Sequence, residues 1–130
     1  MARGASVTVL MPGKWNNHPV ARLASRRRYG VLLGGGVQIF EYHAGMIHAK
    51  VLIIDGNWSV LGSTNFDNRS FVLNDEVNVA LLDVALSRRL QADFAADIGN
   101  SRAVSLEEWR RRSLLERALA ALGRLVERQQ

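Results

Sequence analysis

Cysteine is absent from this 130-residue chain, and so is any long apolar run. The lack of thiols excludes disulfides, thiolate metal sites and a cysteine nucleophile. No apolar run approaches the roughly 20 residues that a helix needs to cross a bilayer. The apolar stretch within residues 1–11 is also too short for the core of an export signal. We therefore expect a chain with no membrane span and no export signal of its own.

The overall composition is that of an ordinary globular protein. Apolar residues make up 48% and charged residues 22% of the sequence, which argues against disorder. A chain of this length can bury one hydrophobic core. Because the sequence shows no internal repeat and no low-complexity linker, we expect a single domain over residues 1–130.

The charges are unevenly distributed along the chain. Residues 1–40 contain six basic residues and no acid, and residues 101–130 contain seven arginines and four glutamates. Residues 41–100 contain four basic and eight acidic residues, so the net charge of +5 comes from the two ends. Basic ends suit an anionic partner, such as a phospholipid surface or a nucleic acid. The alternative is an arginine-rich surface that only faces water.

Hydrophobic periodicity predicts five strands and three helices. The strands are expected at 7–11, 37–42, 46–54, 58–61 and 76–82, and the helices at 19–33, 83 to about 98, and 105–128. Asp83 and Ser105 are suited to N-cap the last two helices, and Glu108 forms a capping box with Ser105. This order predicts an α/β fold, a layered sandwich with a mixed β-sheet flanked by helices.

The predicted C-terminal helix, at about 105–128, is amphipathic. Arginines occupy one face, and another face carries an apolar stripe formed by Leu114, Leu115, Ala118, Leu119, Leu122, Leu125 and Val126. A basic amphipathic helix can lie on a membrane surface. It can also pack against its own domain, and that is the simpler interpretation.

Two polar side chains interrupt the apolar strand predicted at 46–54. Successive side chains of a strand alternate between its faces, so His48 and Lys50 should point the same way, about 7 Å apart. The next predicted strand runs into Ser63 and Asn65. If the two strands are antiparallel, these residues return to the level of His48 and Lys50.

These residue types together suit a phosphate ester. Lys50 and Asn65 would bind phosphate oxygens, with Ser63 in support. Gly62 would let the backbone approach closely, and His48 would either attack phosphorus or protonate a leaving oxygen. A lone histidine or lysine on a strand is usually structural. Here the spacing H-x-K-x4-D-x6-G-S-x-N places six defined residues within 18 positions, which is far more specific than one short motif.

At this point the sequence resembles a known family. Six residues match the HKD motif of the phospholipase D superfamily, namely His48, Lys50, Asp55, Gly62, Ser63 and Asn65. The flanking segments 42–50, 58–59, 65–71 and 73–78 resemble the second, C-terminal half of bacterial cardiolipin synthases. The resemblance runs from about residue 6 to residue 125.

The resemblance implies a mechanism and a role for several residues. Family enzymes join two HKD halves in one site, where one histidine forms a phosphohistidine intermediate and the other acts as acid and then base. His48 would be one of this pair. Glu76, eleven residues after Asn65, matches the family carboxylate that hydrogen-bonds the catalytic histidine and would fix its tautomer. The competing interpretation of Glu76 is a surface carboxylate at a strand end.

The resemblance also implies phosphatidyl transfer in cardiolipin synthesis. The partner would be an anionic, phosphatidylglycerol-like phospholipid, and the position peripheral, on the cytoplasmic face of the bacterial inner membrane. No cofactor and no metal are expected, because no set of carboxylates or histidines has ligand spacing and Lys50 supplies the positive charge. Asp55 belongs to the motif but lies in an Asp-Gly-Asn turn, where it would cap backbone amides, so we interpret it as scaffold.

One HKD motif makes only half of such a site. The chain is then a fragment whose other half lies elsewhere, a homodimer that pairs two copies of the motif, or an inactive remnant that only binds lipid or a partner. In a homodimer, hydrolysis of nucleic acid is an alternative activity, although the flanking residues favour lipid. His43, just before the motif, either lines the mouth of the site or is an ordinary loop histidine.

Overall fold

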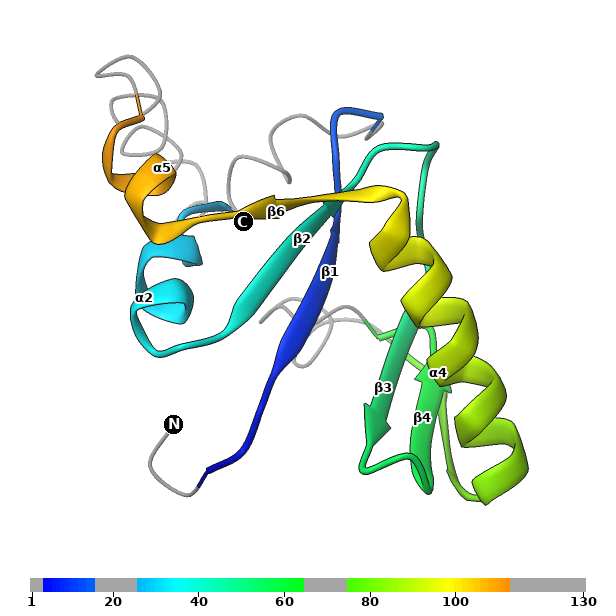
Figure 1. The fold of residues 1–130 in the computed structure, drawn as a ribbon. Coiled ribbons are helices and arrows are strands. Elements are labelled where there is room, and N and C mark those ends of the chain that lie inside the picture. Colours follow the sequence, from blue (N-terminus) through cyan, green and yellow to red (C-terminus); the bar gives the residue numbers. More distant parts are fainter. Residues whose placement is uncertain (1–3, 16–25, 65–74, 113–130) are drawn as a thin grey trace. The chain divides into compact units, whose positions relative to one another are not determined.

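A computed structural model describes residues 4–15, 26–64 and 75–112 of the chain (Figure 1). The chain divides into two compact units, which are described separately. The first, here called the sheet A unit, comprises Met1–Ile47 and Asn100–Gln130. The second, the sheet B unit, comprises His48–Gly99. Each combines a three-stranded sheet with helix, which confirms the predicted mixed α/β class.

The sheet A unit is built on strands β1 (Thr8–Pro12), β2 (Gln38–Tyr42) and β6 (Ser101–Val104), in the order β1-β2-β6. Strands β1 and β2 are parallel, and β6 runs antiparallel to β2. This sheet is mixed, as the sequence predicts. Strand β6 was missed, because its four residues are too few to show a hydrophobic period. Its pairing with β2, about 60 residues earlier in the sequence, forms it.

Two short helices complete the core of this unit. Helix α2 (Tyr29–Gly34) ends just beyond the helix predicted at 19–33, whose first part lies outside the described residues. Helix α5 (Leu106–Arg110) brings Trp109 to Tyr29, with ring centroids 5.4 Å apart and planes inclined by 46°. Buried Tyr29, Ile39, Val104 and Trp109 form the core cluster.

Helix α5 begins at the predicted N-cap. The Ser105 hydroxyl accepts a hydrogen bond from the Glu108 amide at 3.0 Å, which satisfies one of the free N–H groups of the first turn. The second half of the predicted capping box differs, because the Glu108 carboxylate pairs with Arg102. The rest of the predicted C-terminal helix lies outside the described residues.

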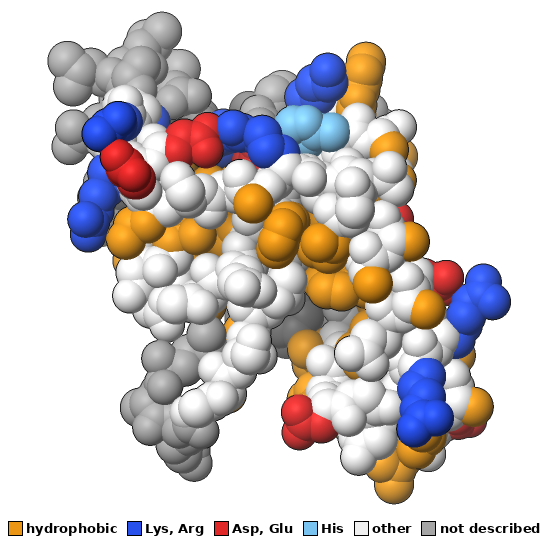
Figure 2. Space-filling view, in the orientation of Figure 1, with side chains coloured by type: hydrophobic (Ala, Val, Ile, Leu, Met, Phe, Trp, Pro, Cys, Tyr) orange, Lys and Arg blue, Asp and Glu red, His pale blue; other side chains and the backbone are white. Residues whose placement is uncertain are grey.

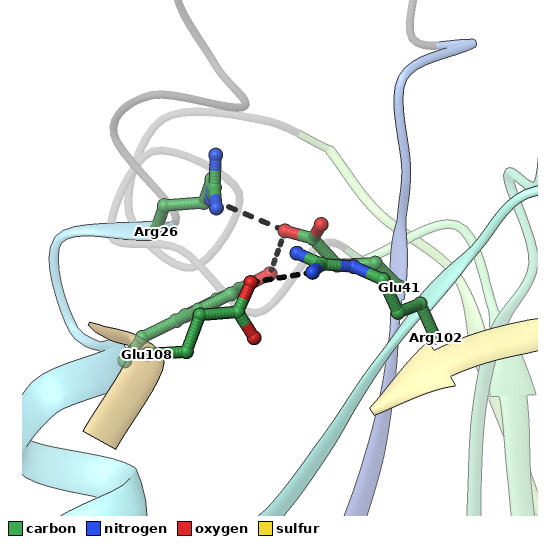
Figure 3. A network of polar contacts seen from close by, with 5 residues as sticks. Arg26, Glu41, Arg102 and Glu108 are labelled. Carbon is green, nitrogen blue, oxygen red and sulfur yellow. Dashed lines mark hydrogen bonds and ion pairs between the residues drawn. The ribbon is translucent and has the colours of Figure 1, made fainter. Parts of the chain in front are cut away.

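A buried carboxylate lies beside this core (Figure 3). Glu41 is 1% exposed, and its Oε1 lies 3.1 Å from Arg26 Nε and 3.4 Å from the Tyr29 hydroxyl, which donates to it. The contact with Arg26 is an ion pair without hydrogen-bond alignment, since the Arg26 Nε–H has no hydrogen-bond acceptor. Arg102 and Glu108 form a second pair next to it. A buried carboxylate requires such partners.

The sheet B unit contains strands β3 (Lys50–Ile54), β4 (Trp58–Gly62) and β5 (Asn78–Leu82) in an antiparallel meander. Residues 55 and 56 form the turn between β3 and β4, with φ angles of 49° and 67°. Asn57 N–H donates to Ile54 O across this turn. Asp and Gly tolerate the left-handed region, which is why this pair makes tight hairpins.

Helix α4 (Val84–Gly99) covers one face of sheet B. Asp83 caps it as predicted, accepting from the Leu86 amide at 2.9 Å. The fully buried hydroxyls of Ser59 on β4 and Ser87 on α4 are 2.7 Å apart, so each satisfies the other. Among the described residues, no helix is both long and apolar enough to cross a membrane.

Two features of the predicted sheet differ from the structure. The strands divide between two sheets, whereas one mixed sheet was expected. Strand β3 also begins at Lys50, four residues after the start of the strand predicted at 46–54. His48 therefore lies in the segment that leads into the strand and not on the strand itself.

The two units carry opposite net charge. The sheet A unit has thirteen basic and five acidic residues, whereas the sheet B unit has four basic and seven acidic residues. Figure 2 shows Lys and Arg side chains along the edge of the sheet A unit that carries α5 and the end of β1. The basic character that the sequence shows at both ends is thus gathered in one unit.

Candidate active site

His48 and Lys50 contact each other although they do not share a strand face. Lys50 Nζ lies 2.8 Å from each ring nitrogen of His48, and it donates to the His48 carbonyl oxygen at 3.0 Å. The ammonium thus lies within hydrogen-bond distance of both ring nitrogens. Because an ammonium only donates, it can bond only to the ring nitrogen that lacks a proton. The arrangement places a fixed cation next to a potential nucleophile or base.

Lys50 opens a row of three residues across sheet B. It lies opposite Gly62 on β4, and Gly62 lies opposite Asn78 on β5. Directly opposed residues of antiparallel strands point to the same face. Ser59, whose hydroxyl contacts Ser87 on α4, lies three residues before Gly62 on β4, so the two positions point to opposite faces of the sheet. The row therefore lies on the face away from α4. Strands β3 and β4 are antiparallel, so the end of β4 returns to the level of Lys50.

Gly62 has a packing role in this row. A Cβ atom at this position would collide with the Asn78 side chain and with the Val77 carbonyl oxygen. The Asn78 amide passes over Gly62 and donates to the Thr64 hydroxyl at 2.5 Å. Thr64 is buried and directly precedes Asn65. Asn65 itself lies outside the described residues.

Ser63 joins the end of β4 to the start of β5. Its amide donates to the Val77 carbonyl at 3.0 Å, and its hydroxyl accepts from the Val77 amide at 3.0 Å. The Ser63 hydroxyl also faces the Val77 carbonyl at 3.4 Å. The contacts of this side chain are thus with backbone. They bring half-buried Glu76, the neighbour of Val77, to the Gly62 end of the sheet.

Asp55 lies at the opposite end of β3 from Lys50, in the hairpin turn. This position is the one the sequence indicates for a scaffold residue. Sequence reasoning had no role for Asn78 and Thr64, although an asparagine two residues after Glu76, at the start of an apolar strand, was a usable signal. Neither residue belongs to the spacing pattern of the motif.

A pocket of about 770 Å³ lies in the sheet A unit, and its lining includes Arg26, Glu41, Arg102, Glu108 and Trp109. Its charged groups are largely paired with one another. The hydrogen bond to Glu108 raises the pKa of Arg102, and burial acts against this rise. We assign this pocket to the ion-pair network of the sheet A unit. Among the described His, Asp and Glu side chains, no group of three is placed to hold a metal ion.

The chain is a phospholipase D-like domain. The family model described as "Cardiolipin synthase, PLD-like domain" matches residues 1–98, and the chain belongs to this family. It is 38% identical over 123 residues to the minor cardiolipin synthase ClsB of Bacillus subtilis and 34% identical to cardiolipin synthase 2 of Staphylococcus epidermidis. These matches cover 95% of this chain but 31% and 25% of those proteins.

The chain thus spans about a quarter to a third of the length of these curated relatives. Among solved structures it is similar to Nuc of Salmonella typhimurium, a phospholipase D family member. The TM-score is 0.66 and the identity 18%, over 80% of this chain and 67% of that one. This likeness supports the fold.

Proposed function

We propose that this chain supplies one of two HKD half-sites for phosphatidyl transfer in cardiolipin synthesis. The contact of Lys50 with His48, at the row that continues through Gly62 to Asn78, carries the proposal. It combines a cation for phosphate oxygens with an imidazole that can take or give a proton. Membership of the cardiolipin synthase family supports the choice of reaction.

The reaction would take place in two displacements. A histidine nitrogen attacks the phosphorus of a phosphatidyl ester, the bond to the leaving glycerol oxygen breaks, and the second histidine protonates that oxygen. An acceptor alcohol then loses its proton to the second histidine and attacks phosphorus, which breaks the phosphorus–nitrogen bond. His48 would be one of these two histidines. Lys50 and Asn65 would stabilise the charge on the phosphate oxygens.

The neighbouring residues would support this chemistry in different ways. Glu76 would accept a hydrogen bond from His48 and so fix its tautomer. Ser63 would act through its bonds to Val77, which fasten the segment that carries Glu76. Gly62 and Asp55 would be scaffold.

The substrate we propose is an anionic phospholipid of the phosphatidylglycerol type, met at the cytoplasmic face of a membrane. The curated relatives are named cardiolipin synthases, and the basic sheet A unit suits an anionic surface. The site would be completed by a second HKD half, from another segment or from a second copy of this chain.

His48→Ala tests the catalytic assignment. We expect it to reduce phosphatidyl transfer by about 10²- to 10⁴-fold, the range for loss of a general acid or base. Turnover would be measured on phosphatidylglycerol vesicles in EDTA, with the chain alone and with a first HKD half supplied in trans. Asp93→Ala is the matched control, because among the described residues Asp93 pairs with exposed Arg89 on the surface of α4 in the same unit.

The outcomes separate the candidate functions. Turnover that survives His48→Ala would show that His48 takes no part in the chemistry. Turnover that disappears in EDTA would contradict charge stabilisation by Lys50 alone. Cleavage of DNA in preference to phosphatidylglycerol would favour a nuclease and contradict the proposed substrate.

A further inference from the structure

The segment after β1 is fastened to the end of β2 within the sheet A unit. A Cβ atom on buried Gly13 would collide with the Tyr42 carbonyl oxygen and the His43 ring, so the two segments touch there. Two residues on, the Trp15 indole N–H donates to the His43 carbonyl oxygen at 3.1 Å. The Trp15 side chain is thus oriented by a bond to the neighbouring strand end. Residues 13–15 with His43 are here called the Trp15 patch.

The Trp15 ring is held but uncovered. It is 56% exposed, whereas Trp109 of the same unit is 8% exposed and lies in the core. Lys14 Nζ lies 5.1 Å from the centroid of the Trp15 ring. A tryptophan with a satisfied N–H, an open apolar ring and an adjacent cation has the chemistry of a membrane–water interface.

Charge favours a bilayer over another protein as the occupant. The unit that carries the patch has thirteen basic and five acidic residues, and basic side chains line its edge near the end of β1 (Figure 2). Anionic lipid headgroups attract such a surface by about 1 kcal/mol for each basic residue near it. Insertion of an aromatic ring adds an apolar contribution to this attraction.

The patch is also tied to the candidate active site by the chain itself. His43, which accepts the Trp15 hydrogen bond, lies five residues before His48. Five residues span at most about 18 Å when fully extended. The chain between them therefore limits the distance between the Cα atoms of His43 and His48 to about 18 Å.

We propose that the Trp15 patch binds the surface of an anionic bilayer and holds His48 near the lipid headgroups. This inference rests on the proposed function in taking a phospholipid as substrate. It adds the surface by which the domain meets the membrane. Lys14 contributes charge, and Trp15 contributes the apolar contact.

Vesicle flotation of the whole chain tests the patch. Trp15→Ala should weaken binding to phosphatidylglycerol-containing vesicles by about tenfold or more. Lys14→Gln should weaken it by about fivefold. Val31→Ala is the control, because Val31 is 80% exposed on α2 of the same unit but lies outside the patch, and it should bind like the unchanged chain.

Three results would overturn the inference. The first is that Trp15→Ala and the unchanged chain bind vesicles equally well. The second is that the chain binds phosphatidylglycerol vesicles and pure phosphatidylcholine vesicles equally well. The third is that Trp15→Ala changes the oligomeric state of the protein in solution without vesicles. The last would mean that protein covers the patch. Circular dichroism of each variant excludes loss of folding as the cause. His48→Ala should bind vesicles normally, so failure of the patch and failure of the catalytic proposal are distinguishable.

Discussion

At the scale of single residues, Glu41 is a buried carboxylate whose charge needs partners within the described structure. Its carboxylate is nearly inaccessible to water and depends on Arg26 and on the Tyr29 hydroxyl. Removing one partner of a buried ion pair leaves the other charge uncompensated. We expect Glu41→Ala to lower the free energy of unfolding by about 3 kcal/mol, as measured by urea denaturation.

Glu107 provides the matched control for this change. It pairs with Arg111 on the surface of α5, and its side chain is 73% exposed. Exposed pairs contribute little because water and salt screen them. Glu107→Ala should therefore change stability by no more than about 0.5 kcal/mol. Equal effects of the two substitutions would show that burial does not set the importance of Glu41.

At the scale of elements, the contact of the Asn78 side chain with Gly62 joins β5 to β4 beside the candidate site. Gly62→Ala should lower the free energy of unfolding by about 1–3 kcal/mol, because the added methyl group meets the Asn78 side chain and the Val77 carbonyl. Gly99→Ala, where a Cβ would meet nothing, is the control in the same unit. Both are measured by urea denaturation.

A double-mutant cycle tests whether the Asn78 side chain is the group that the new methyl group meets. In an Asn78→Ala background the cost of Gly62→Ala should fall by at least about 0.5 kcal/mol, because one of the two clashing groups is gone. Part of the cost should remain, since the Val77 carbonyl is backbone. Strictly additive effects would contradict a contact between Gly62 and the Asn78 side chain.

At the scale of the whole molecule, the proposed half-site would have to be completed before it could act. We expect turnover to require a second HKD half. If that half comes from a second copy, an equal mixture with His48→Ala at fixed total concentration should retain about a quarter of the activity, because random pairing leaves that share of intact dimers.

A missing half on another segment gives a different result. The chain alone is then an inactive monomer, and activity appears when a first HKD segment is added. The oligomeric mass of the protein in solution, measured together with its turnover, distinguishes the homodimer from the inactive monomer. Activity that halves in the mixture and does not change on dilution would mean that each chain acts by itself, which contradicts a shared site.

The sequence alone was enough for part of the local structure around the candidate site. The Asp-Gly turn predicted the hairpin that brings Gly62 opposite Lys50. His48 and Lys50 were expected on one strand face, about 7 Å apart, whereas they are in contact and His48 lies outside the strand. The N-caps at Asp83 and Ser105 were also predicted from the sequence. Turn, cap and alternation rules depend on residues only a few positions apart, so they can be read before the chain is folded.

Other features were decided only by the tertiary structure. The exact start of β3, the pairing that forms β6, the burial of Glu41 and the passage of Asn78 over Gly62 to Thr64 had no local signature. Each depends on a partner fourteen or more residues away, or on how neighbouring strands pair. The sequence indicated the groups to which we assign the proposed chemistry, and it determined the turn that brings Gly62 opposite Lys50. Packing decided what holds those groups in place, because burial and side-chain contact arise only when distant segments meet.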